Sequence, residues 1–293
     1  MPTYFEKFND KQLLEWYYAY CKNHIKNNSF VIPKSNDVLS RQRNDVYNVY
    51  AYGDCIKIVY IKNGKKLKYP DTEKNKIPLN NQLTEKDKNE RFSQSISRSR
   101  SRIFELAMCN EFEFFCTFTQ DQTKRNRFDL FEFRKDFTQF IRNQNRFRNE
   151  NEKIKYLLIP EQHKDGAWHL HGLLKGLTEN DLYEFTLQDN IPKKMKDKIR
   201  KGEKIYNWHK YHQKFGYFTC TKIKEKNACS KYITKYISKD LQKTVHESGE
   251  HLFFASKGLK SKEIILKNCY DKCPIDCWDY ENEYVKVKEI YVR

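Results

Sequence analysis

The sequence predicts an α+β protein with a central antiparallel β-sheet flanked by helices. Two segments have the pattern of β-hairpins, in which runs of β-branched and aromatic residues flank a turn that contains glycine. Between and beyond them, apolar residues recur at helical spacing. Because hairpins join neighbouring strands antiparallel, the alternation of helices and strands here does not require a parallel sheet.

Residues 1–90 form a predicted accessory region with no motif that assigns a role. Leucines and aromatic residues at 13–20 have nearly helical spacing. The runs on either side of the dipeptide Asn63-Gly64, within 55–69, predict the first hairpin. The polar stretch 70–89 is expected to be a linker or a surface loop.

A second domain is expected from residue 91 to residue 293. A stripe of four apolar residues at helical spacing, Phe133, Phe137, Phe140 and Ile141, predicts a helix that packs on a core. The expected elements are, in order, a helix at 93–109, a buried strand at 112–119, a helix at 128–147, strands at 155–160 and 167–174 around an Asp-Gly turn, a strand at 217–223 and a helix at 228–241.

The charge of the chain favours a polyanionic partner. Lys and Arg total 56 against 39 Asp and Glu, which gives a net charge of +17. Neutralised phosphates release counterions, so such a chain suits nucleic acid. The alternative is a lysine-rich solvated surface. Membrane attachment is not expected, because the sequence has no long apolar run, signal peptide, basic amphipathic anchor or lipidation motif.

Nine scattered cysteines, an odd number, fit a reducing cytoplasm better than a disulfide scaffold. Cys269, Cys273 and Cys277 are spaced four residues apart. A structural zinc site usually has four ligands, and no fourth ligand accompanies these three. We therefore favour three cysteines that share a helix face or lie under a loop, with zinc as the alternative.

A pair of histidines suggests a metal site. His169 and His171 lie in a hydrophobic segment, and alternation along a strand places both imidazoles on one face. Glu161 ends the preceding strand. With a loop of Asp165–Ala167, His163 would oppose His169 and Glu161 would oppose His171. The alternative is that both histidines are hydrogen-bonded core residues.

Glu161, His169 and His171 together would offer two nitrogens and one oxygen to a divalent cation, with positions left for phosphate oxygens and water. Mg²⁺ prefers oxygen ligands, so Mn²⁺ is expected to bind such a mixed site more tightly. His163 faces the same way and competes with Glu161 for the third position.

Two tyrosines form a second cluster. In the segment 231–239, Tyr232 and Tyr236 stack on one helix face, while Lys235 and Lys239 repeat on an adjacent face. An amphipathic helix with half-buried tyrosines would have the same pattern. A tyrosine oxygen can instead attack a DNA phosphodiester and retain the 5′-phosphate as an ester. Neighbouring ammonium groups are expected to favour its phenolate.

These motifs, in this order, resemble those of the HUH endonuclease superfamily, specifically the rolling-circle replication initiators of phages and plasmids. The segment 115–119 (FCTFT) is similar to the first, strand-forming motif. The segment 168–174 (WHLHGLL) resembles the metal motif, and 232–239 (YITKYISK) resembles the two-tyrosine version of the nucleophile motif. Asn207-Trp208, Phe215-Gly216 and the segment 256–259 also look like fixed points of a phage and plasmid subgroup.

The resemblance spans about residues 93–265 and implies a ferredoxin- or RRM-like sheet with the two histidines on a central strand. It implies metal ligation by Glu161, His169 and His171, with Tyr232 and Tyr236 as nucleophiles. It also implies metal-dependent nicking and rejoining of single-stranded or hairpin origin DNA in the cytoplasm of a bacterial host. The chain has no phosphate-binding loop for a helicase of its own, so a host helicase is an expected partner.

Three other functions fit parts of the pattern. A plasmid relaxase or a single-strand transposase uses the same chemistry, although relaxases more often place the tyrosine before the histidines. A non-catalytic origin binder or repressor would need no metal. An RNA-binding protein on an RRM-like sheet would also bind without metal dependence.

Overall fold

The structure is a computed structural model that describes residues 45–62, 85–237, 241, 251–269, 273, 275 and 277–291. It confirms the α+β class, and both of its sheets are antiparallel throughout. The expected helix at 13–20 lies outside the described residues. The chain divides into two compact units, one of residues 1–81 with 261–293 and one of residues 82–260.

The first unit contains a five-stranded sheet in the order β10-β1-β2-β12-β11. Its strands are β1 (Val46–Tyr52), β2 (Cys55–Ile61), β10 (Glu263–Cys269), β11 (Tyr280–Glu281) and β12 (Val285–Tyr291). Apolar side chains from β1, β2, β10 and β12 form its core, among them Val49, Ile58 and Leu266. Strand β2 pairs with β1 along one edge and with β12 along the other, so neither edge is left for the second strand of the expected hairpin. The turn at Asn63-Gly64 and that strand lie outside the described residues.

The boundary between the units differs from the expected division at residue 91. Residues from Ser261 onward belong with the first unit, because β10 pairs with β1 and β12 pairs with β2. The sequence analysis placed this segment with the second domain, since nothing local in it indicates a long-range strand partner. Of the three cysteines considered for zinc, Cys273 is half-buried and Cys277 is exposed. The side chain of Cys269 lies outside the described residues.

The second unit contains a seven-stranded sheet in the order β6-β7-β8-β3-β5-β4-β9. Its strands are β3 (Phe114–Thr119), β4 (Lys155–Gln162), β5 (Trp168–Lys175), β6 (Leu182–Glu184), β7 (Tyr206–Trp208), β8 (Phe218–Lys222) and β9 (Phe254–Ala255). Its helices are α2 (Glu85–Cys109), α3 (Leu130–Asn145), α4 (Lys193–Arg200), α5 (His209–Lys214) and α6 (Lys226–Ile233). Short 3-10 turns are η1 (Glu150–Glu152), η2 (Glu179–Asp181) and η3 (Thr234–Tyr236). Since α2 begins at Glu85, the end of the loop expected at 70–89 is helical.

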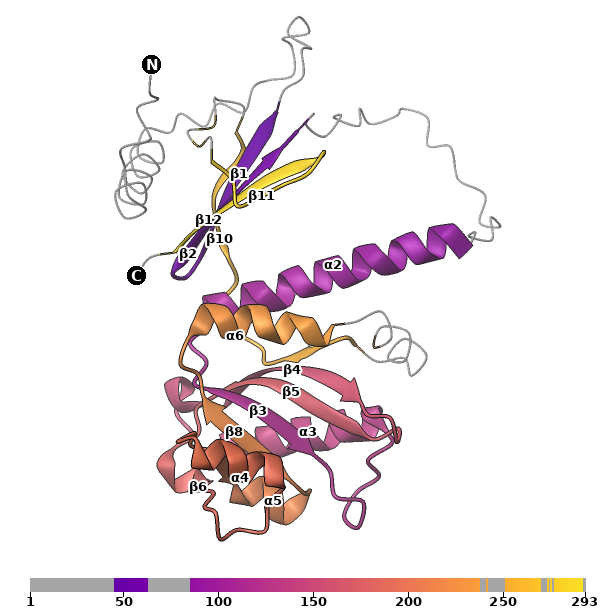
Figure 1. Cartoon of the computed structure of the whole chain (residues 1–293), viewed down its shortest axis with the longest axis vertical. Helices are drawn as coiled ribbons and strands as arrows, with labels where there is room; N and C mark the ends of the chain where they lie inside the picture. Colours follow the sequence, from indigo (N-terminus) through magenta and orange to yellow (C-terminus); the bar gives the residue numbers. More distant parts are fainter. Residues whose placement is uncertain are drawn as a thin grey trace, which may run out of the picture. The chain divides into compact units, whose positions relative to one another are not determined.

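Helix α3 covers one face of this sheet, as its apolar stripe predicts (Figure 1). Phe137 meets Phe118 of β3 with ring centroids 4.9 Å apart and Tyr156 of β4 at 5.0 Å. Phe133 and Phe140 are also buried. These contacts remove large apolar areas from water and are the main stabilising contribution on this face.

The opposite face of the sheet has an apolar half and a polar half. Leu157, Ile159 and Leu173 point to this face and are fully buried, and helices α2 and α6 lie on this side (Figure 1). Ile233, at the end of α6, is also fully buried in the same core. Toward the β4–β5 turn the side chains on this face become polar. The apolar half therefore anchors α6 beside the polar half.

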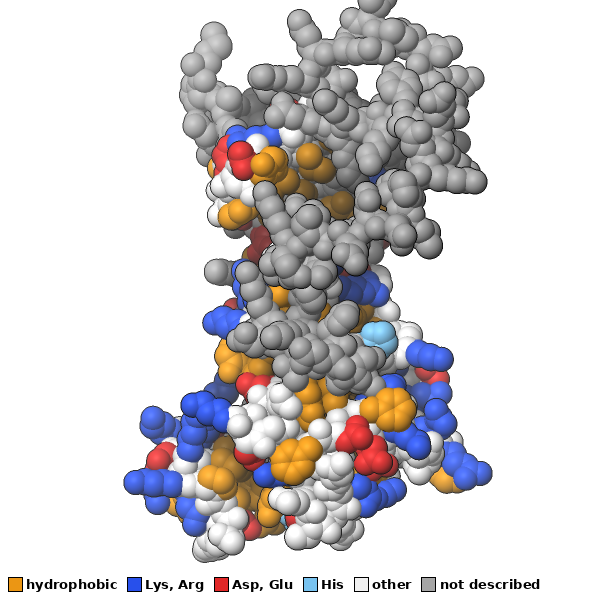
Figure 2. All heavy atoms as spheres, turned by 90° about the vertical axis from the view of Figure 1, so that its right-hand side faces the viewer, with side chains coloured by type: hydrophobic (Ala, Val, Ile, Leu, Met, Phe, Trp, Pro, Cys, Tyr) orange, Lys and Arg blue, Asp and Glu red, His pale blue; other side chains and the backbone are white. Residues whose placement is uncertain are grey.

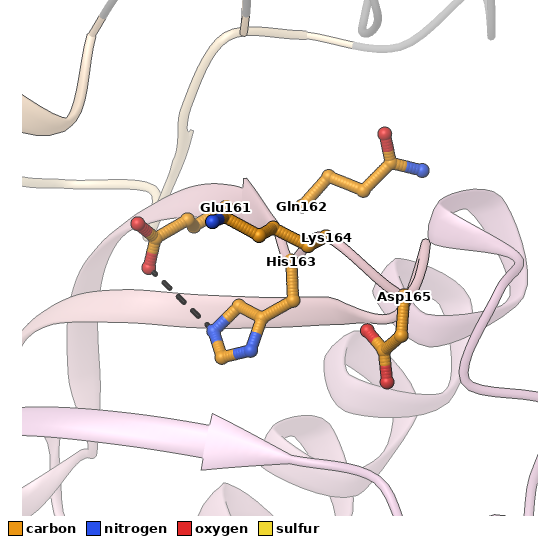
Figure 3. Close-up of a pocket in the computed structure, with 5 residues that line it drawn as sticks. All are labelled: Glu161, Gln162, His163, Lys164 and Asp165. Atoms are coloured by element: carbon orange, nitrogen blue, oxygen red, sulfur yellow. Dashed lines mark ion pairs between the residues drawn. The ribbon is translucent and has the colours of Figure 1, made fainter.

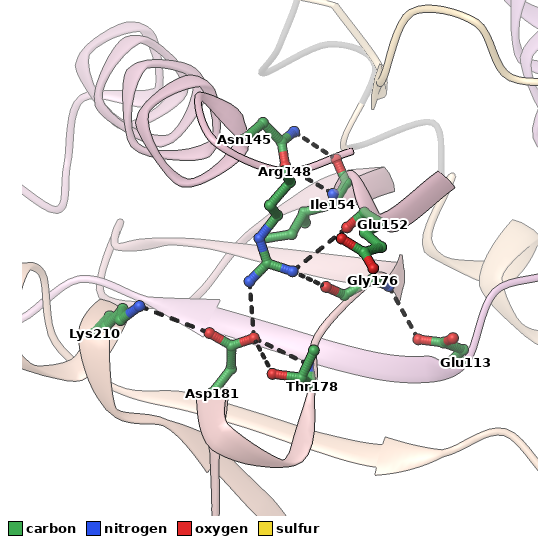
Figure 4. A network of polar contacts seen from close by, with 9 residues as sticks. All are labelled: Glu113, Asn145, Arg148, Glu152, Ile154, Gly176, Thr178, Asp181 and Lys210. Carbon is green, nitrogen blue, oxygen red and sulfur yellow. Dashed lines mark hydrogen bonds and ion pairs between the residues drawn. The ribbon is translucent and has the colours of Figure 1, made fainter. Parts of the chain in front are cut away.

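An ion pair between Arg148 and Asp181 stabilises the segment 176–181, which follows β5 (Figure 4). Arg148 donates to the Asp181 Oδ2 at 2.8 Å and also to the carbonyl of Gly176. The same Oδ2 accepts from the backbone N–H and hydroxyl of Thr178 at 3.0 and 2.9 Å. Burial opposes the charge of Asp181, but these hydrogen bonds outweigh it and lower the pKa of its carboxyl.

Three of the fixed points noted in the sequence are structural. Trp208 is fully buried and packs on Phe140 with ring centroids 4.9 Å apart. Gly216 has φ of +144°, and a Cβ there would lie 2.4 Å from the Asp121 amide nitrogen. The hydroxyl of Ser256 accepts from the backbone N–H of Tyr156 at 2.9 Å. None of the helices that the structure describes has both the length and the apolar character needed to cross a membrane.

Candidate metal centre and tyrosine pair

The β4–β5 hairpin presents the histidines on one face, as expected, but with a different register. His163 and Ala167 close the loop, because the His163 N–H donates to the Ala167 carbonyl at 2.9 Å. The loop is therefore Lys164–Gly166, with Gly166 at φ +87°, and not Asp165–Ala167. Glu161 consequently opposes His169, not His171. The shift is two residues, an even number, so every side chain keeps its predicted face.

Threonines on β3 hold the inner nitrogens of both histidines. Thr117 lies opposite His171, and Thr119 lies opposite His169. Each threonine Oγ1 is 3.0 Å from the Nδ1 of its histidine. The tautomer with its proton on Nδ1 donates to the threonine and leaves Nε2 with a lone pair. Both imidazoles are therefore oriented as metal ligands commonly are.

Four side chains with ligand atoms gather at the hairpin. The ring nitrogens of His163, His169 and His171 include a set within 4.8 Å of one another. The rings of His163 and His169 stack at 3.7 Å with planes 4° apart. Glu161 Oε2 lies 2.6 Å from His171 Nε2 and 3.9 Å from His163 Nε2. Figure 3 shows Glu161 and His163 turned toward each other in an open pocket along the turn.

The geometry places both candidates for the third ligand at the cluster. Glu161 is close to His171 but does not belong to the tight set of three histidines, whereas His163 does. The side chains of Glu161 and His163 are about equally exposed, at 43% and 46%. The predicted ligand set of Glu161, His169 and His171 therefore stays a prediction.

The outer nitrogen of His171 fits a cation. His171 Nε2 is buried and makes no hydrogen bond with any residue that the structure describes, although Glu161 Oε2 is 2.6 Å away. Two electron-rich atoms this close repel unless a proton or a metal ion lies between them. Burial, then the nearby His163, lowers the pKa of His171 to about 4, and burial likewise lowers the pKa of His169 to about 4. Both rings are thus neutral at neutral pH, as ligation requires.

The two tyrosines lie beside this cluster. Helix α6 ends at Ile233 and continues as the 3-10 turn η3, which contains Tyr236. The hydroxyl oxygens of Tyr232 and Tyr236 are 3.5 Å apart, and their rings meet edge to face. The ring of Tyr236 stacks on His171 with centroids 4.7 Å apart and planes 12° apart. The two predicted sites are therefore one surface.

The electrostatic setting of the tyrosines differs from the expectation. Burial raises the pKa of Tyr236, and the hydrogen bond with Tyr232 and the charge of Glu161 raise it further. This environment disfavours the Tyr236 phenolate, the opposite of what the neighbouring lysines were expected to do. Lys235 Nζ lies 5.7 Å from the centre of the Tyr232 ring. Lys239 lies outside the described residues, so its predicted role stays a prediction.

Some residues that shape the site were not predicted. Thr117 and Thr119 alternate in the segment FCTFT with the same period of two as the histidines, which is a signal in the sequence. Arg100 of α2 donates two hydrogen bonds to the carbonyl of Ile237, at 3.0 and 2.6 Å, directly after Tyr236. Nothing local in the sequence of α2 indicates that long-range contact. The two hydrogen bonds from Arg100 hold the backbone at Ile237, directly after Tyr236.

One comparison with known protein families found a match to part of the chain. Residues 113–241 match the model of the family described as replication-associated protein ORF2/G2P. The match covers less than half of the chain. It includes the three histidines of the cluster, His163, His169 and His171, and both tyrosines, Tyr232 and Tyr236. It supports a replication-associated, initiator-type protein. Neither the curated proteins nor the solved structures gave a match to the chain.

Proposed function

We propose that the chain initiates rolling-circle replication by nicking and rejoining single-stranded origin DNA in a metal-dependent reaction. The observation that carries the proposal is the stack of Tyr236 on His171, which joins a candidate nucleophile to a candidate metal ligand. The match of residues 113–241 to a replication-associated family supports the same reading. A relaxase or transposase would share this chemistry, and no feature of the described residues favours either.

The proposed step is a transesterification at phosphorus. A phenol oxygen of Tyr232 or Tyr236 forms a bond to the scissile phosphorus while the bond to the 3′ oxygen breaks. The phenol proton passes to solvent, and the 3′ oxygen takes up a proton as a free hydroxyl. The 5′-phosphate stays on the tyrosine, so the 3′-hydroxyl can reverse the step without ATP.

The chain's own residues position this reaction. Thr117 and Thr119 orient His171 and His169, and Arg100 fixes the backbone after Tyr236. Mn²⁺ or Mg²⁺ held by the two histidines with Glu161 or His163 would withdraw charge from the scissile phosphate. The two hydroxyls are 3.5 Å apart, which supports attack by either tyrosine at nearly the same point.

The proposed partners follow from the charge and from the motifs. A net charge of +17 favours binding to DNA phosphates. Single-stranded or hairpin origin DNA is the proposed substrate. A host helicase would separate the strands, in the cytoplasm of a bacterial host, because the sequence has no phosphate-binding loop of its own.

The test is the formation of a covalent adduct. Labelled single-stranded fragments that tile the DNA molecule carrying this gene are incubated with the protein and Mn²⁺, then separated by denaturing electrophoresis. We expect one fragment to give a slower protein–DNA band that is lost with EDTA and in the double variant Tyr232→Phe/Tyr236→Phe. Binding of fragments without any such band would favour a non-catalytic origin binder or an RNA-binding protein instead.

A further inference from the structure

Two phenylalanines at the start of α3 are exposed, although the apolar stripe of the helix is buried. Phe128 precedes the N-cap residue Asp129 and is 46% exposed, and Phe131 in the first turn is 53% exposed. Phe133, two residues later, is 1% exposed. Rings this exposed contribute little to the stability of the fold, and two of them three residues apart offer a small apolar surface to a ligand.

Each of these rings has a guanidinium group beside it. The Arg127 Cζ lies 5.2 Å from the centre of the Phe128 ring, and the Arg134 Cζ lies 5.3 Å from the centre of the Phe131 ring. Both distances are typical of cation–π contacts. A flat ring beside a positive charge offers a stacking surface for a base and an attraction for the adjoining phosphate.

Phe128 lies at the β4–β5 turn, which joins the two strands of the candidate metal centre, whereas α3 itself covers the other face of the sheet. The Arg127 carbonyl accepts from the backbone N–H of Trp168 at 2.8 Å, one residue before His169. Arg127 also donates to the Asp165 carboxylate at 2.7 Å, in the turn that begins with His163. The Phe128 ring lies against Gly166 of the same turn, 3.6 Å from where a Cβ would be. Figure 2 shows hydrophobic side chains among Lys and Arg side chains on the face that this end of the hairpin presents.

We propose that Phe128 and Phe131 form a stacking platform for unpaired bases of the DNA strand that flanks the cleaved phosphate. The inference rests on the proposed function, because it assumes that the DNA strand passes the metal centre. It selects single-stranded over duplex DNA, since base faces inside a duplex are already stacked on one another. The platform reads no sequence, because every base has a π-face.

The chain contains a matched control for this platform. Phe147 is 89% exposed, and the Arg146 Cζ lies 5.3 Å from the centre of its ring. This third pair follows the C-terminal end of α3, 16 residues long, and so lies about 24 Å from the start of the helix. A general attraction of exposed arginine–phenylalanine pairs for DNA would act there as strongly as at the platform.

The experiment measures fluorescence anisotropy of a labelled oligo-dT 20-mer with EDTA present. The parent protein is Tyr232→Phe/Tyr236→Phe, which cannot form an adduct. We expect Phe128→Ala/Phe131→Ala to weaken binding by at least about tenfold, as loss of base stacking predicts. We expect Phe147→Ala to leave the affinity within about twofold. A 20-mer of abasic sites, with the same phosphate charge, should bind the parent and the Phe128→Ala/Phe131→Ala variant equally.

The outcomes separate the platform from the proposed nicking activity. An equal loss in the Phe147→Ala variant, an equal loss on the abasic strand, or no loss on oligo-dT would each overturn the platform. None of these results bears on the adduct assay, which uses both tyrosines and Mn²⁺. A parent protein that does not bind oligo-dT would overturn the platform and count against a single-stranded DNA substrate. An unchanged melting temperature of each variant confirms that the loss is one of binding.

Discussion

The phenol ring of Tyr236 lies face to face with the imidazole of His171, with centroids 4.7 Å apart and planes 12° apart. One residue comes from the central strand β5 and the other from the turn that follows α6. The Tyr232 hydroxyl adds a second phenol oxygen 3.5 Å from that of Tyr236. The ligand cluster and the two candidate nucleophiles therefore share one surface, which the proposed reaction requires.

The third metal ligand is predicted to be Glu161, because its Oε2 is 2.6 Å from the buried Nε2 of His171. We expect Glu161→Gln to lower Mn²⁺ affinity by at least about tenfold. His163→Gln should change it less, and His169→Ala should abolish specific binding. Isothermal titration calorimetry with Mn²⁺ measures all three. If His163→Gln has the larger effect, the ligand set is the three histidines.

The threonines of β3 are predicted to position the histidines. Thr119→Val keeps the shape of the side chain but removes the oxygen that is 3.0 Å from His169 Nδ1. We expect Mn²⁺ affinity to fall about tenfold while the melting temperature without metal is unchanged. Thr219→Val is the control, because Thr219 lies opposite Thr117 on β8, one strand farther from the histidines. An equal loss of affinity in both variants would contradict the positioning role.

Gly172, directly after His171, is predicted to be required for the packing of β4 on β5. A Cβ at this position would lie 2.0 Å from the Leu157 carbonyl oxygen. We expect Gly172→Ala to lower the free energy of unfolding by about 3 kcal/mol, measured by urea denaturation. Gly202→Ala is the control: its Cβ would meet nothing within 4 Å, although its φ is +83°. It should cost about 1 kcal/mol. Similar costs would show that the backbone at Gly172 shifts to accommodate the methyl group.

The ion pair of Arg148 and Asp181 predicts a pH dependence of stability. The pKa of Asp181 is lowered in the folded protein, because hydrogen bonds outweigh its burial. Its stabilisation is therefore complete above the unfolded pKa of about 3.9 and is lost as the pH falls through the folded pKa. Urea denaturation between about pH 2.5 and 7 should show a smaller loss of stability on acidification in Asp181→Asn than in the wild type. Asp197→Asn, in an exposed pair with Arg200, should behave like the wild type.

Local sequence patterns predicted the faces and spacings of the candidate site residues better than they predicted the pairing of distant strands. Alternation placed His169 and His171 on one face, and the helical spacing of Tyr232 and Tyr236 brought their hydroxyls together. The apolar stripe of α3 was also predicted correctly. Each of these inferences depends on periods of two or 3.6 residues, which the backbone enforces within one element.

The errors come from relationships between distant segments. The loop length of the β4–β5 hairpin changed the partner of Glu161 without changing its face, because both alternatives have an odd number of loop residues. Strand β2 pairs with β12, more than 200 residues later, and no local pattern indicates that pairing. The contact of Arg100 with the Ile237 carbonyl depends on how α2 packs on α6. Such contacts form only when distant segments pack together in the folded protein, so no local sequence pattern indicates them.

The most direct measurement of the central claim is mass spectrometry of the adduct. Trypsin cleaves after Lys231, Lys235 and Lys239, so the two tyrosines fall on separate peptides, residues 232–235 and 236–239. After Mn²⁺-dependent reaction with DNA and nuclease trimming, we predict a 5′-nucleotide ester on one or both of these peptides. DNA cleavage with both peptides unmodified, or with the nucleotide on another residue, would contradict the proposed tyrosine chemistry.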